Sequence, residues 1–195
     1  MRLIKYILIL LLIPALASGG WYYAGTHEVK YYGFPNTAGT PSAPVGSWTS
    51  WGTPVDSTYC NKYDPIVSGT ITGINAYVRN DSWTTNAWLV VYRETALIGY
   101  SDALGTPGVG WTGYLSLNVV GGQNLNYTSG DNDLYYGLAW DASDGDPKLG
   151  YDDGGSSVDI FYDTAPVHSG APDPTATSWA TSAADDMGVI LRVTE

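Results

Sequence analysis

Short runs of β-type residues, with no helical periodicity after the first twenty residues, constrain the fold of this chain more than any other feature. The runs are rich in Val, Ile, Tyr, Trp and Thr, and residues typical of turns separate them. We expect strands at residues 28–34, 59–64, 69–80, 86–93, 96–102, 111–119, 133–142, 147–152, 157–163 and 186–194. Short strands at this spacing predict an all-β protein with an antiparallel sandwich or barrel.

Several of these runs alternate in hydrophobicity. One face is shared by Met187, Val189, Leu191 and Val193 in the last run, and by Leu134, Tyr136, Leu138 and Trp140 in the run 133–142. Because successive side chains of a strand point to opposite faces, this pattern predicts one face on a core and the other toward solvent.

The runs 69–80 and 86–93 are predicted to form a hairpin around residues 81–85. If Ile74, Ala76 and Val78 face the core, Tyr77 faces outward. Whether Trp88 and Tyr92 join Tyr77 on an exposed aromatic platform depends on the register, which the sequence leaves open. A core position is the favoured interpretation for Trp88.

The first nineteen residues have the pattern of a secretory signal peptide. Arg2 and Lys5 precede an apolar run, Pro14 breaks it, and Ala15-Leu16-Ala17 supplies the small residues that a signal peptidase requires. We therefore expect cleavage near Ala17 to Gly20 and a secreted, extracellular protein. The apolar run is too short to span a bilayer of about 30 Å as a helix. Stable membrane insertion is therefore not expected after cleavage, and an uncleaved anchor is the less favoured alternative.

The remaining chain is predicted to have two parts. Residues 20–57 hold an N-terminal strand and a loop rich in Pro, Gly, Ser and Thr, and residues 58–195 form the sandwich domain. The single cysteine, Cys60, excludes an intramolecular disulfide and is expected to be a buried structural residue. The core must therefore supply the stability of the fold by packing.

The charge of the chain limits its partners. The formal net charge is −11, and it becomes more negative when Arg2 and Lys5 leave with the leader. Nucleic-acid binding needs Lys and Arg to neutralise phosphates, so we exclude it, together with attraction to anionic membrane surfaces. An acidic protein favours neutral or cationic partners and divalent cations.

The central runs resemble the jelly-roll modules of secreted microbial and phage proteins. The resemblance covers about residues 59–142 and rests on an aromatic strand at 59–64, a strand with Gly69-Thr70 and Tyr77-Val78, a strand ending in Tyr92, and the closing sequence Tyr136-Gly137-Leu138-Ala139-Trp140. Such modules are similar in shape to carbohydrate-binding and adhesin domains. The resemblance implies a jelly-roll type of β-sandwich, and it brings no catalytic residues.

An acidic loop is the candidate metal site. Asp141, Asp144 and Asp146 lie close together around the turn residue Gly145. Calcium takes six to eight oxygen ligands, which carboxylates and carbonyls of such a loop can supply, so we expect calcium as a possible cofactor here. Solvated aspartates that only favour turns are the alternative. Asp131-Asn132-Asp133 is a second, weaker candidate.

Aromatic side chains are the candidate ligand-binding residues, because flat rings match the apolar faces of sugars. The first set is Tyr77 and Trp83 on the predicted hairpin. The second set lies on the long loops 35–57 and 164–182 and consists of Trp48, Trp51 and Trp179. A tryptophan in such a loop can instead fold back as a lid on the edge of a core.

The sequence contains no nucleophile elbow, no zinc-protease motif and no phosphate-binding loop, so an enzyme is not expected. We therefore expect a secreted, non-catalytic binding module for neutral glycans on a cell surface or in an extracellular matrix. The alternative is a self-associating structural subunit of an extracellular filament, sheath or surface layer, whose partners are like subunits. A polysaccharide-cleaving enzyme ranks third.

Overall fold

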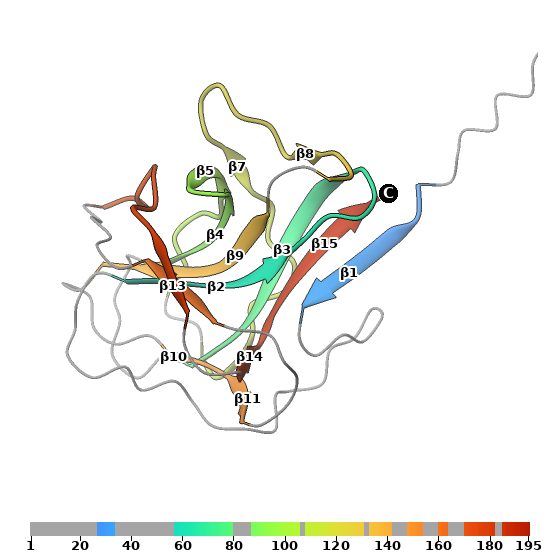
Figure 1. The fold of residues 1–195 in the computed structure, drawn as a ribbon. Coiled ribbons are helices and arrows are strands. Elements are labelled where there is room, and N and C mark those ends of the chain that lie inside the picture. The colour runs from blue at the N-terminus through green and yellow to red at the C-terminus, as the bar shows by residue number, and fades with distance from the viewer. Residues whose placement is uncertain are drawn as a thin grey trace, which may run out of the picture.

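Two antiparallel sheets form the body of the protein. The computed structural model describes residues 27–33, 57–79, 87–105, 108–130, 133–141, 148–153, 160–163, 170–181 and 185–195. Within these ranges every regular element is a strand. In Figure 1, β1, β15 and β3 of one sheet run obliquely across β2 and β9 of the other.

Each sheet is built from strands that are far apart in the sequence. The six-stranded sheet contains β1 (Val29–Gly33), β3 (Gly69–Arg79), β6 (Gly110–Trp111), β8 (Asn126–Tyr127), β10 (Lys148–Leu149) and β15 (Val189–Thr194). The seven-stranded sheet contains β2 (Ser57–Tyr63), β4 (Ala87–Arg93), β5 (Ala96–Tyr100), β7 (Asn118–Val119), β9 (Leu134–Trp140), β12 (Phe161–Asp163) and β13 (Trp179–Thr181). A separate ribbon pairs β11 (Tyr151–Asp153) with β14 (Asp185–Met187).

The all-β antiparallel sandwich expected from the sequence is confirmed. The strand order is β1-β15-β3 in one sheet and β2-β9-β4-β5 in the other, so the chain passes repeatedly between the sheets. The finer jelly-roll assignment stays a prediction, which this interleaving supports.

A hydrophobic core fills the space between the sheets. The expected faces of β9 and β15 both point into it: Leu134, Tyr136, Leu138 and Trp140 from the first, and Val189, Leu191 and Val193 from the second. Ile74, Ala76 and Val78 of β3 meet them from the six-stranded sheet, as the sequence predicts. Dispersion contacts and removal of apolar surface from water make this core the main source of stability.

The expectation that the opposite face meets solvent is wrong for β9. A second cluster covers the outer face of the seven-stranded sheet and contains Cys60, Trp88, Val90, Tyr92, Leu97, Tyr135, Ala139 and Ala176. Residues of the segment 170–181 contribute to the cover of this face: Ala176 and Trp179 pack in the cluster, and the Tyr92 hydroxyl donates to the carbonyl of Asp173. Both faces of β4 are therefore buried, and its sequence is apolar at almost every position.

The predicted hairpin between the runs 69–80 and 86–93 is also wrong. β3 pairs with β15, β6, β8 and β10, whereas β4 pairs with β5 and β9 in the other sheet. Tyr77 therefore cannot share a platform with Trp88 and Tyr92. Trp88 is only 4% exposed, which confirms its predicted core position, although it lies in the outer cluster.

The described residues include no helix long and apolar enough to cross a membrane. The predicted signal peptide, residues 1–19, lies outside the described residues, as does most of the loop 35–57.

Candidate functional site

A cleft of about 460 Å³ opens at one edge of the sandwich. One wall is the segment Asp102–Gly105, which follows β5, and the other is formed by Thr112, Leu115, Ser116 and Asn118, which lie between β6 and β7 or begin β7. Sites for small molecules usually have volumes of about 300 to 1,000 Å³, so the cleft is large enough for a ligand of modest size.

The cleft exists because one segment crosses from the first sheet to the second. Thr112 and Leu115 form backbone hydrogen bonds with Ala76 and Ile74 of β3 in the six-stranded sheet. Three residues later, Asn118 pairs with Tyr100 of β5 in the seven-stranded sheet. The cleft lies beside this crossing segment, which supplies Thr112, Leu115, Ser116 and Asn118 to its lining.

The floor of the cleft is apolar and its rim is polar. Leu104 is almost fully buried in the core, where its backbone N–H donates to Ala87, and Leu115 packs partly against the same core. The exposed rim carries a carboxylate, a hydroxyl and an amide, supplied by Asp102, Ser116 and Asn118. None of the described residues that line the cleft is a cation.

Asp102 is held in place by its neighbour on the rim. The Asn118 side-chain amide donates to Oδ1 of Asp102 over 2.8 Å. No ion pair between described residues involves Asp102. Its carboxylate therefore keeps capacity to accept hydrogen bonds from a ligand.

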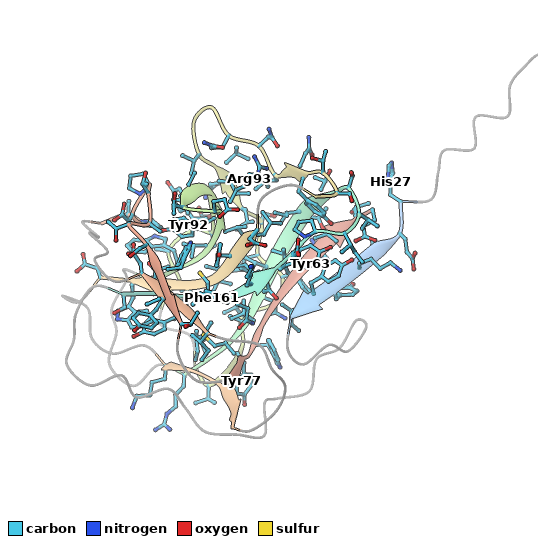
Figure 2. All side chains as sticks on the ribbon, viewed as in Figure 1. His27, Tyr63, Tyr77, Tyr92, Arg93 and Phe161 are labelled. Carbon is cyan, nitrogen blue, oxygen red and sulfur yellow. The ribbon has the colours of Figure 1, made fainter. Side chains whose placement is uncertain are left out.

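Tyr77 lies near this region but outside the cleft. Its ring meets Trp111 edge-on, with 5.4 Å between ring centroids, because the two residues are directly paired on β3 and β6. Neither Tyr77 nor Trp111 is among the residues that line the cleft. Figure 2 shows Tyr77 at the end of the molecule near β14.

Trp179, the other predicted aromatic that the structure describes, packs against the outer cluster. It stacks on Tyr135 at 4.7 Å and meets Tyr92 edge-on at 5.3 Å. Its indole N–H donates to the backbone carbonyl of Glu94 over 2.6 Å. Trp179 and Tyr77 belong to different sheets, so the structure does not bring them together, and Trp179 folds back as the lid that the sequence offered as an alternative.

The buried side chains beneath Trp179 have low chemical reactivity. Cys60 is fully buried, as predicted, and burial raises the pKa of its thiol well above the usual value. Burial likewise raises the pKa of Tyr92, whose hydroxyl donates to the carbonyl of Asp173 over 2.8 Å. A protonated buried thiol is a poor nucleophile, so this cluster is a packing feature.

Most of the remaining predicted site residues lie outside the part of the chain that the structure describes. Trp48, Trp51, Trp83, Asp144 and Asp146 lie outside the described residues. Asp141, at the end of β9, is described and half-buried. Among the described residues, no group of three or more His, Cys, Asp or Glu side chains is arranged to hold a metal ion.

Sequence reasoning missed the cleft. The sequence predicts one strand over 111–119, whereas the structure has two short strands, β6 and β7, joined by the crossing segment. Gly110 and Gly113 within this region both have positive φ, which signals a bend in a strand-like run. Those glycines were the available sign that the run would not continue as one strand.

No protein-family model, curated protein or solved structure matches this chain. The fold and the geometry of the cleft therefore carry the functional argument alone.

Proposed function

We propose that this protein is a secreted, non-catalytic module that binds neutral glycans on a cell surface or in an extracellular matrix, and that the cleft beside Asp102 is its binding site. The composition of the cleft carries the proposal. A sugar ring presents C–H faces and hydroxyl edges, and the cleft offers an apolar floor below a rim of carboxylate, hydroxyl and amide groups.

The charge of the site supports a neutral ligand rather than an anionic one. Among the residues that the structure describes, the lining contains one carboxylate and no cation, and the chain as a whole is strongly acidic. A phosphorylated or carboxylated ligand would meet repulsion here, whereas sugar hydroxyls can donate to Asp102 without a change of net charge.

Asn118→Ala should weaken retention on an immobilised neutral polysaccharide by about tenfold, because a hydrogen bond to a ligand and the bond that orients Asp102 are both lost. Asp102→Ala should have an effect at least as large. Affinity electrophoresis through gels that contain each polysaccharide would measure both. Binding should also change little with salt, since screening acts only between charges.

Val119→Ala is the matched control. Val119 follows Asn118 on β7, is 51% exposed and does not line the cleft. Equal retention of wild type, Asn118→Ala and Val119→Ala on every glycan that the wild type binds would rule out this cleft as the site. A large oligomer in size-exclusion chromatography, without retention on any glycan, would favour the self-associating subunit instead.

The calcium site remains part of the proposal, at the loop Asp141–Asp146. When the free calcium concentration is one hundred times the dissociation constant, binding stabilises the folded state by about 2.7 kcal/mol. Millimolar calcium should therefore raise the melting temperature, and a chelator should lower it. The double variant Asp144→Asn, Asp146→Asn should lose this response. Differential scanning calorimetry would measure it.

Sodium chloride at equal ionic strength is the necessary control for calcium. The chain has a formal net charge of −11. Repulsion among like charges destabilises the folded state of an acidic protein, so any salt that screens these charges can raise the melting temperature. A calcium response no larger than the sodium response would count against a specific site.

A further inference from the structure

Three tyrosines and one carboxylate, all from different parts of the chain, meet beside β1, the edge strand of the six-stranded sheet. Tyr32 of β1 stacks on Tyr63 of β2, with 4.0 Å between ring centroids and 22° between ring planes. Tyr127 of β8 meets Tyr63 edge-on at 6.0 Å. The hydroxyl of Tyr32 donates to the side-chain carboxylate of Glu195. Figure 2 shows Tyr63 on the side of the molecule where β1 and β15 run together.

The backbone fixes this arrangement. Tyr32 is paired with Leu191 in the β1–β15 ladder, and Glu28 and Glu195 exchange two backbone hydrogen bonds of 3.0 Å beyond the end of it. Tyr32 and Tyr63 both pack against the inter-sheet core, yet each keeps part of its surface exposed. An oxidant in solution can therefore reach the edge of the pair.

The hydrogen bond to Glu195 matters for the chemistry of Tyr32. Burial and the neighbouring carboxylate raise the pKa of Tyr32, and burial raises that of Tyr63, so both phenols are protonated at neutral pH. A protonated phenol loses an electron readily only when its proton can leave at the same time. Glu195 already accepts the hydrogen bond from the Tyr32 hydroxyl, and its carboxylate is the base that can take this proton.

We propose that Tyr32 and Tyr63 form an oxidative cross-linking site, at which a one-electron oxidant, such as a haem peroxidase with hydrogen peroxide, joins their rings. Tyr32 loses one electron, and its phenolic proton passes to Glu195. The Tyr32 radical then adds, through a ring carbon ortho to its hydroxyl, to the corresponding carbon of Tyr63, and the adduct loses the second electron together with the hydrogen of that Tyr63 carbon as a proton. The hydrogen on the coupled carbon of Tyr32 moves to its oxygen and restores that phenol, while Tyr63 keeps its own hydroxyl. The two electrons and two protons reduce one hydrogen peroxide to two waters.

The cross-link would stabilise this chain in the way that an intramolecular disulfide stabilises other proteins. The chain has a single cysteine, so no intramolecular disulfide can form. A bond between Tyr32 and Tyr63 ties β1 of one sheet to β2 of the other and closes the loop of chain between them. Closing a loop restricts the unfolded chain and stabilises the folded state. The inference is independent of glycan binding.

Oxidation of the full mature chain with peroxidase and hydrogen peroxide tests the proposal. We expect dityrosine fluorescence, a monomer lighter by two hydrogen atoms, and a cross-linked peptide pair that contains residues 32 and 63. Tyr63→Phe should abolish this product while the fold is kept, because the Tyr63 hydroxyl is buried without a hydrogen-bond partner. Glu195→Gln keeps an acceptor oxygen but is no base, and it should slow the reaction by about tenfold.

Tyr31→Phe is the matched control. Tyr31 is the neighbour of Tyr32 on β1, and its ring lies tilted against Tyr114 at 5.5 Å. This variant should give the wild-type yield. The proposal is overturned if Tyr63→Phe gives an unchanged yield, if the linked peptides of the wild type lack residue 32 or 63, or if the links join only separate molecules. An unchanged rate in Glu195→Gln would remove the role of the carboxylate.

Discussion

Gly137→Ala should destabilise the fold by more than about 3 kcal/mol, which is the upper range for overpacking and a large part of the total stability of a domain. Gly137 lies in the middle of β9, paired with Cys60 of β2 on one side and Val90 of β4 on the other. A Cβ atom at this position would overlap the carbonyl oxygen of Tyr59 and would lie 2.7 Å from the Cα of Cys60. Both are backbone atoms, so no side chain can rotate to make room. Urea unfolding followed by tryptophan fluorescence would measure the loss.

Gly121→Ala is the control for this prediction. A Cβ at Gly121 would meet nothing within 4 Å, and the residue is not among the glycines with positive φ. Its substitution should change the stability by less than about 0.5 kcal/mol, or raise it slightly by restricting the unfolded chain. If Gly137→Ala unfolded at the same urea concentration as Gly121→Ala, the close approach of β2 to β9 would be wrong.

Gly137 also shows how far the sequence predicts the sheets. Alternation in 133–142 correctly assigns Leu134, Tyr136, Leu138 and Trp140 to the core, because the period of a strand is local. The burial of the opposite face could not be predicted in the same way. It depends on residues 170–181, which are distant in sequence and show no periodicity that reveals their position.

The failed hairpin has a related cause. A short polar connection between two strand-like runs can join neighbours within a sheet or strands of two different sheets, and the turn residues are alike in both. β3 and β4 are joined by the second kind of connection. Only the strand pairing of the whole chain, including β15 at its end, shows which one applies.

The candidate site is harder to predict from the sequence than the sheets are. Asp102, Ser116 and Asn118 are ordinary surface residue types that no motif marks, and the crossing between β6 and β7 brings them together. The sequence favours aromatic residues as the ligand-binding candidates, but the chain contains sixteen tyrosines and eight tryptophans, and most of those described take part in packing. Residue type alone cannot separate a tryptophan that packs from one that binds a ligand.

Trp179→Ala should destabilise the protein by about 3 kcal/mol. This value is the lower end of the range for removal of a core tryptophan, because Trp179 is only partly buried. The substitution removes a stacked contact with Tyr135 and an edge contact with Tyr92, each worth about 1 kcal/mol beyond burial. It also removes the indole donor to the carbonyl of Glu94, which turns between β4 and β5 with a left-handed φ of 53°. Thermal unfolding and glycan retention should be measured on the same samples.

Trp179→Phe separates the two contributions, because it keeps a ring over Tyr135 and loses only the donor to Glu94. We expect it to cost about 1 kcal/mol, the usual value of one hydrogen bond. The backbone N–H of Glu94 still donates to Asp133 over 2.8 Å in this variant, so the turn should persist. If Trp179 only packs, the melting temperature should fall from the wild type to Trp179→Phe and further to Trp179→Ala. Glycan retention per folded molecule should be the same for all three proteins. Loss of retention at a constant melting temperature would instead place Trp179 in a ligand site and move the proposed binding surface from the cleft to the outer face of the seven-stranded sheet.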